Sequence, residues 1–308
     1  MNTKIVYLLT LGENGARFFE MLLLSIHSLK LHNPGVRTVV VTDTRSKALL
    51  GGRAGALPPD IHLTVVDVPP EWEKYKSRYL KTKLRFLVEG DYLYVDVDTL
   101  IAGSLNDIDL VTADIAAVPD GNGPLGLWNT KEAEICRQAG IPSPIGKPYF
   151  NGGVMYVKDT PSAYLFFERW HHLWKTMATK VEGRDQMSLL AANEQLGHPL
   201  HVLSGAWNCQ VLHSSSLHYY QKAKILHYYL CGFIERFVLP HVKDGILDND
   251  ALMLAANPLQ KDFRFYFPGH IRLSSPWSHI LYLSRKNIRL FLYLRSLTGR
   301  IASLLCKK

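Results

Sequence analysis

For its first hundred residues the chain alternates short apolar segments with longer segments of helical periodicity. Residues 4–9, 37–42 and 61–68 are predicted strands, because they are short, apolar and rich in β-branched side chains. Residues 16–32 and 71–89 are predicted helices, because apolar side chains recur there every three or four positions. Such alternation is typical of a parallel sheet with helices on both faces, so we expect an α/β fold.

The next apolar segment, residues 90–95, is followed directly by two carboxylates, Asp96 and Asp98. Residues two apart on a strand point to the same side, so both carboxylates are expected to face one way. In parallel sheets, ligands bind at the carboxyl ends of the strands. Two neighbouring acids are costly to bury unless a cation lies between them, so the pattern favours a divalent metal site. A solvated, Asp-rich turn is the alternative.

Beyond Asp98 the alternation is less regular. A turn at Gly152-Gly153 is predicted to lead into a strand that ends at Val157, and Thr160-Pro161 is typical of a helix start. Another helix is expected to open at Arg184-Asp185-Gln186. Further strands are predicted at residues 113–118, 201–203 and 224–228. No glycine-rich dinucleotide or P-loop motif occurs, which argues against those two classes of nucleotide-binding enzyme.

The charge of the chain is concentrated at one end. Residues 263–308 hold nine Lys or Arg side chains and no acid, whereas the remainder holds 26 basic and 27 acidic ones. A nearly neutral body argues against a nucleic-acid groove, and a basic tail indicates an anionic partner surface. With 47% hydrophobic residues a sizeable core is expected, and we predict a catalytic domain at 1–245 and an extension at 246–308.

Within that extension, residues 280–308 place leucine and isoleucine along one helical stripe with basic side chains beside it. Such a helix can lie in a membrane interface, and docking on the catalytic domain is the alternative. The four cysteines lack paired spacing, and no segment resembles a secretory leader or a membrane-spanning helix. We therefore expect a cytoplasmic protein, with the tail as its peripheral contact with the inner face of the membrane.

Taken in order, the motifs resemble those of the GT-A-fold glycosyltransferases, most closely the retaining family 8 group. The resemblance covers residues 5–236. It rests on a helix with Arg78 and Lys81, followed by Leu93-Tyr94-Val95-Asp96-Val97-Asp98, Phe150-Asn151-Gly152-Gly153-Val154, Arg184-Asp185-Gln186, Trp207-Asn208 and Ile225-Leu226-His227-Tyr228. It implies a Rossmann-like fold with a mixed, mainly parallel sheet covered by helices.

The resemblance also implies a role for each matching residue. Asp96, Asp98 and His227 correspond to ligands of Mn²⁺ or Mg²⁺, and Asp96 also to a residue near the ribose. Gln186 corresponds to the residue beside the anomeric carbon, and Asp185 to its catalytic neighbour. The other substrate-binding positions implied are Thr10 in the base-binding turn, the basic residues Arg78 and Lys81, and Asn151, Gly152, Gly153 and Asp185 around the donor sugar.

Two segments depart from the family pattern. The first strand of the family usually ends with an acid, whereas here the turn is Thr10-Leu11-Gly12. After the metal-binding histidine the family has H-x-x-G-x-x-K-P-W, but in this chain Gly232 comes two places late and Lys-Pro-Trp is missing. Arg236 is the basic residue that could take the place of the lysine at the diphosphate.

From the resemblance we expect a metal-dependent transferase that moves a hexose from a nucleotide diphosphate sugar, UDP above all. The expected acceptor is a cell-envelope glycan or glycolipid, with retention of configuration. One alternative is an inverting enzyme of the same fold, with Asp120 or Asp185 as the base. A non-catalytic protein that binds sugar nucleotides or a membrane surface is the other. A sugar-1-phosphate nucleotidyltransferase is disfavoured, because its basic, glycine-rich turn is missing.

Overall fold

The structure of the chain is a computed structural model. It describes residues 1–12, 16–123, 134, 136–138, 140–141, 149–179, 183–211, 216, 219–229, 242–243 and 246–247. Arg236 and the predicted basic tail at 280–308 lie outside these residues. The predicted domain boundary at residue 245 therefore stays a prediction.

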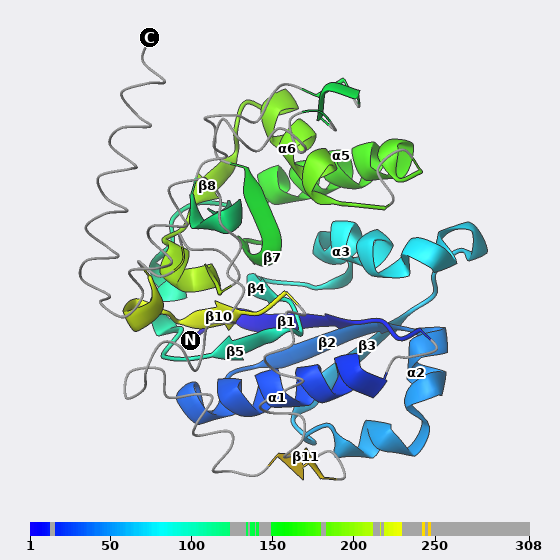
Figure 1. Cartoon of the computed structure of the whole chain (residues 1–308), viewed down its shortest axis with the longest axis vertical. Helices are drawn as coiled ribbons and strands as arrows, with labels where there is room; N and C mark the ends of the chain where they lie inside the picture. The colour runs from blue at the N-terminus through cyan, green and yellow to red at the C-terminus, as the bar shows by residue number, and fades with distance from the viewer. Residues whose placement is uncertain are drawn as a thin grey trace, which may run out of the picture.

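A seven-stranded sheet forms the centre of the molecule, in the order β3-β2-β1-β4-β7-β6-β8 (Figure 1). Every strand in it runs parallel to β1 except β7, which is antiparallel to both of its neighbours. The strands are β1 Lys4–Leu9, β2 Thr38–Asp43, β3 Ile61–Val66, β4 Tyr92–Val95, β6 Ile115–Pro119, β7 Phe150–Val157 and β8 Leu200–Val202. The predicted mixed, mainly parallel sheet is thus confirmed.

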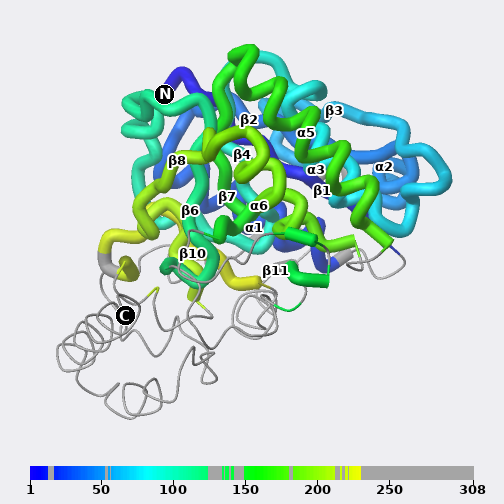
Figure 2. Tube along the Cα trace, turned by 90° about the horizontal axis from the view of Figure 1, so that it is seen from above, coloured from blue at the N-terminus to red at the C-terminus, as the bar shows by residue number. Residues whose placement is uncertain are grey.

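Helices cover both faces of this sheet. They are α1 Ala16–His32, α2 Thr44–Leu50, α3 Lys76–Leu87, α5 Pro161–Met177 and α6 Gln186–Gln195. One face packs against α3, α5 and α6, and the other against α1 (Figures 1 and 2). The predicted helix at 71–89 is instead a 3₁₀ helix at Pro70–Tyr75 followed by α3. None of the described helices has the length and apolar character needed to cross a lipid bilayer.

A second, three-stranded sheet lies on the α1 side of the molecule. It consists of β5 Thr99–Ile101, β10 Ile225–His227 and β9 Cys209–Gln210, with β10 between the other two. The sequence pattern predicts β10 but neither β5 nor β9, because segments of two or three residues show no periodicity. A separate antiparallel pair is formed by β11 Val242–Lys243 and β12 Ile246–Leu247.

The predicted turn at Gly152 and Gly153 is wrong, because both glycines lie inside β7. Glycine is uncommon in a strand interior and often marks a close approach of another group. Since β7 runs antiparallel to β4, its first residues lie beside the carboxyl end of β4, with Val154 opposite Val95. The direction of β7 therefore brings the glycines to the strand end that carries Asp96.

The core on the helical face is dominated by aromatic side chains of α5. Phe166, Trp170 and Trp174 are fully buried. The indole Nε1 of Trp170 donates to the backbone oxygen of Asp185 and to Ser188 Oγ, each at 3.2 Å. This contact ties α5 to the start of α6 and so holds Asp185 and the first turn of α6 against the sheet.

Adjacent residues of α5 provide a matched test of this packing. Phe166 is 0% exposed, whereas Leu165 is 54% exposed. We expect Phe166→Ala to lower the free energy of unfolding by about 3–5 kcal/mol, because it leaves a cavity under the helix. Leu165→Ala should change it by less than about 0.5 kcal/mol. Urea unfolding measures both, and equal effects would contradict this description of the core.

Candidate metal and substrate site

Two pairings along the chain bring three predicted site residues together. Asp96 follows β4, and its backbone N–H donates to the carbonyl of Gly153 on β7 at 2.8 Å. In the small sheet, His227 on β10 lies opposite Thr99 on β5. The N–H of Tyr228 donates to the carbonyl of Asp98 at 3.0 Å. His227 is thereby placed beside the two carboxylates, although it is far from them in the sequence.

The side chains of Asp96, Asp98 and His227 converge on one point. Their ligand atoms all lie within 4.8 Å of one another. His227 Nε2 is 3.3 Å from Asp98 Oδ1 and 4.0 Å from Asp96 Oδ2. Adjacent ligands of an octahedral Mg²⁺ ion are about 3 Å apart and opposite ligands about 4 Å apart. Two carboxylates and one imidazole with these separations can hold a divalent ion.

The protonation of this cluster follows from its charges. Burial lowers the pKa of His227, but the charge of Asp98, a hydrogen bond with it and the charge of Asp96 outweigh that effect, so the pKa is raised. Burial raises the pKa of Asp98, but the charge of His227 and the hydrogen bond with it lower this pKa by more. The net shift is therefore downward. Both shifts favour the pair of a protonated His227 and an ionised Asp98 when no metal ion is bound. A divalent cation would take the place of the histidine proton.

Lys81 bridges two of the carboxylates at this site. Its Nζ lies 3.3 Å from Asp96 Oδ1 and 3.6 Å from Asp185 Oδ2, and it also lies over the ring of Tyr94. The Tyr94 hydroxyl donates to Asp96 Oδ1. Among the described residues, Asp185 Oδ2 is buried without a hydrogen-bond partner. An unpaired buried acceptor costs free energy, and a ligand hydroxyl that reached this oxygen would remove that cost.

The two glycines of β7 differ in how much space there is for a side chain. A Cβ on Gly153 would overlap Cε1 of His227 and lie 2.8 Å from Asp96 Oδ2. A Cβ on Gly152 would lie 3.4 Å from Lys81 Cε and 3.5 Å from Asp185 Oδ2, which are ordinary contacts. Only glycine at position 153 therefore lets β7 approach the Asp-Asp-His cluster this closely.

The remaining predicted site residues differ in burial and in their hydrogen-bond partners. Asn151 is buried, and its Oδ1 accepts from the N–H of Gly153 at 2.8 Å. Gln186 opens α6 and donates through Nε2 to the carbonyl of Phe150 at 3.4 Å. Arg78 is exposed on α3, whereas Lys81, one turn later, is buried. The roles predicted for Arg78 and Arg236 remain predictions.

The end of β1, where Thr10 lies, is bordered by a buried ion pair on the neighbouring strand. Leu9 lies opposite Thr42 of β2, and the next residue is Asp43. Lys76 Nζ contacts Asp43 Oδ1 at 3.1 Å, and the same carboxylate caps α2 by accepting from the N–H of Ser46. The Asp43 carboxylate at this edge is thus already paired with Lys76.

Sequence reasoning assigned no role to three residues that contact the cluster. Tyr94 lies two residues before Asp96, and Tyr229 lies two residues after His227, where its ring stacks on the imidazole at a centroid distance of 4.2 Å. Strand periodicity could have indicated Tyr94, which lies on β4, but not Tyr229, which follows the end of β10 at a positive φ. Asn208 was part of a matching motif, but only the structure shows its hydrogen bond with His227.

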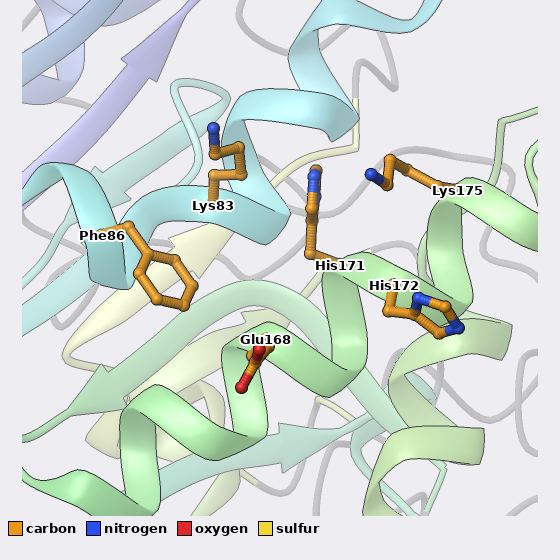
Figure 3. Close-up of a pocket in the computed structure, with 6 residues that line it drawn as sticks. All are labelled: Lys83, Phe86, Glu168, His171, His172 and Lys175. Carbon is orange, nitrogen blue, oxygen red and sulfur yellow. The ribbon is translucent and has the colours of Figure 1, made fainter.

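A hollow lies between α3 and α5 and is lined by none of the predicted site residues. Its lining residues are Lys83, Phe86, Glu168, His171, His172 and Lys175 (Figure 3). Burial, followed by the charges of the two lysines and of His172, lowers the pKa of His171 to about 4. His171 is therefore uncharged near neutral pH, and it hydrogen-bonds Thr82 at 2.7 Å. The geometry gives this hollow no part in the Asp-Asp-His site.

The glycine pair of β7 tests the site geometry directly. We expect Gly153→Ala to weaken Mn²⁺ binding by at least about tenfold, because the new methyl group displaces His227 or Asp96. Gly152→Ala should change the affinity by no more than about twofold, since its methyl group has room. The EPR signal of free Mn²⁺ measures binding, and thermal unfolding confirms that both variants are folded. Equal affinities would contradict the close approach at Gly153.

No protein-family model and no curated protein sequence matches the chain. Solved structures do match it. Mouse xyloside xylosyltransferase 1 in its apo form has a TM-score of 0.51 at 15% identity, over 75% of this chain and 99% of that chain. The galactosyltransferase LgtC, in complex with donor and acceptor sugar analogs, has a TM-score of 0.50 at 16% identity, over 74% of this chain and 87% of the LgtC chain.

A third matching structure is the glycosyltransferase GlyE of Streptococcus pneumoniae TIGR4. Its TM-score is 0.51 at 15% identity, over 82% of this chain and 63% of the GlyE chain, so the match spans less than two thirds of that protein. At such identities the shared feature is the fold, and it agrees with the sheet order and strand directions described above. The chain therefore has the GT-A fold of these glycosyltransferases.

Proposed function

We propose that this chain is a metal-dependent glycosyltransferase that moves a hexose from a UDP-sugar to a cell-envelope glycan or glycolipid, with retention. The observation that carries the proposal is the Asp96-Asp98-His227 cluster at the carboxyl end of β4. In open α/β sheets this is the edge at which ligands bind. The matching glycosyltransferase structures support the reaction class, and the family resemblance of the motifs supports the donor and the stereochemistry.

Asp96, Asp98 and His227 would hold the Mn²⁺ or Mg²⁺ ion of this reaction. When bound, the ion would neutralise the negative charge that develops on the departing diphosphate, without any proton transfer. The surrounding residues prepare the site for a cation. Three carboxylates, those of Asp96, Asp98 and Asp185, lie near one lysine, Lys81, so a divalent ion would balance the remaining negative charge.

The donor sugar would lie between the start of α6 and β7. Asp185 Oδ2, which has no hydrogen-bond partner among the described residues, would accept from a sugar hydroxyl. Lys81 would offset part of the negative charge of Asp185 and Asp96 while the sugar is being held. Gln186 opens α6 next to Asp185 and would face the anomeric carbon. Its amide is neutral and removes no proton, which is consistent with a reaction that needs no carboxylate base.

The test is a screen of nucleotide sugars that measures nucleotide release with Mn²⁺ and with EDTA. We expect one UDP-hexose to support Mn²⁺-dependent release and Asp98→Asn to lower it by more than about a hundredfold, because a charged ligand is lost. Asp107→Asn is the matched control, since Asp107 lies on the surface in an ion pair with Lys224. Release that is insensitive to EDTA, or unchanged in Asp98→Asn, contradicts the metal site. Donor binding without release identifies a non-catalytic binding protein.

Stereochemistry separates the proposal from its inverting alternative. If Gln186 lies at the anomeric carbon, the acceptor can attack from the face that the leaving group vacates, and the product keeps the donor's configuration. The anomeric proton coupling in an NMR spectrum of the product measures this. An inverted linkage would contradict retention and assign the role of base to Asp185 or to Asp120. The Oδ1 of Asp120 accepts a hydrogen bond from Asn151 Nδ2 at 2.9 Å.

A further inference from the structure

Asn208 is a fully buried amide between two residues of the site. It ends a short 3₁₀ helix, Gly205–Asn208, that leads into β9. Its Oδ1 lies 3.0 Å from His227 Nδ1, and its Nδ2 lies 2.9 Å from Asn151 Oδ1. A buried side chain that joins two site residues in this way can control how each of them is protonated or oriented.

The hydrogen bonds that connect Gly153, Asn151, Asn208 and His227 form a series. The direction of each bond follows from groups that can only donate or only accept. The backbone N–H of Gly153 can only donate, and it lies 2.8 Å from Asn151 Oδ1. The carboxylate of Asp120 can only accept when ionised, and it lies 2.9 Å from Asn151 Nδ2. Both contacts require the same orientation of the Asn151 amide. Its oxygen therefore faces Asn208.

The orientation of Asn208 then determines the tautomer of His227. Because Asn151 presents an oxygen, Asn208 must present its Nδ2 hydrogens to it, and Asn208 Oδ1 is left facing the imidazole. An amide oxygen cannot donate, so the proton of this bond belongs to His227 Nδ1. The other ring nitrogen, Nε2, is the one that faces Asp98 and Asp96.

We propose that Asn208 is a positioning residue that keeps the proton of His227 on Nδ1, so that the Nε2 lone pair can bind the divalent ion of the site. This inference rests on the metal-binding part of the proposed function. The ring is also fixed in place, because Tyr229 stacks on its face and Gly153 lies against Cε1. Asn208 therefore governs which nitrogen is protonated, and its neighbours govern where the ring lies.

The carboxylates of Asp96 and Asp98 are the reason that the position of the His227 proton must be controlled. With no partner at Nδ1, a neutral imidazole beside Asp96 and Asp98 would keep its proton on Nε2, where both carboxylates attract it. Nε2 would then have no lone pair to offer. The acceptor at Nδ1 stabilises the tautomer that binds metal, and loss of such a partner typically weakens metal affinity by about 10–100-fold.

Two substitutions at position 208 separate positioning from packing. Asn208→Leu fills a similar volume but accepts no hydrogen bond, whereas Asn208→Asp keeps an acceptor for Nδ1 and gives up the bond to Asn151. We expect Asn208→Leu to raise the Kd for Mn²⁺ by about 10–100-fold and Asn208→Asp to stay within about threefold of the wild type. A residue that only fills space would give the opposite order, with Leu no worse than Asp.

The second readout is ¹⁵N NMR of the histidine ring, with the His227 signals assigned from His227→Gln. In the wild type we expect a slowly exchanging Nδ1–H before and after Mg²⁺ is added, with the metal taking the place of a proton on Nε2. The signal should persist in Asn208→Asp and disappear in Asn208→Leu. A wild-type ring without a proton on Nδ1 overturns the inference, even if Asn208→Leu fails to fold.

These measurements are made without a sugar donor, so they distinguish the two proposals. Metal binding with an intact Nδ1–H, but no release of nucleotide from any donor, would contradict the proposed transferase and leave the role of Asn208 standing. Donor turnover by the wild type, together with unchanged Mn²⁺ affinity in Asn208→Leu, would overturn the role of Asn208 alone.

Discussion

The antiparallel pairing of β7 with β4 is the constraint on which the site depends. It places the first residues of β7 beside the carboxyl end of β4, where Asp96 N–H donates to the Gly153 carbonyl at 2.8 Å. If β7 ran parallel, its glycines would lie at the opposite edge of the sheet, away from Asp96. Because Gly153 has no side chain, His227 can enter from the small sheet and contact the same carboxylate.

Around the paired ends of β4 and β7, each buried charged group lies beside a group of opposite charge, and the buried amides are hydrogen-bonded. Lys81 lies between Asp96 and Asp185, His227 contacts Asp98, and Asn208 joins His227 to Asn151. Buried charges are tolerated only when they are paired and hydrogen-bonded. The site is therefore preorganised by the protein, with one carboxylate oxygen, Asp185 Oδ2, left without a hydrogen-bond partner among the described residues.

Prediction from the sequence succeeded where a local pattern reports on local structure. Thr160 does cap α5, accepting from the N–H of Ala163, with Pro161 at the first helical position. It failed at Gly152 and Gly153, where a pair of glycines in a strand cannot be told from a turn without knowing what packs against it. It also overlooked β5 and β9, whose two or three residues are strands only because β10 lies between them.

The sequence by itself determined the alternating α/β order of the first hundred residues and the strand that precedes Asp96 and Asp98, because both depend on side-chain periodicity within one segment. Only the tertiary structure decided the direction of β7, the burial of Lys81 beside Asp96 and the hydrogen bond from His227 to Asn208. These depend on contacts between segments that are distant in the chain, and no periodicity within a segment encodes such contacts.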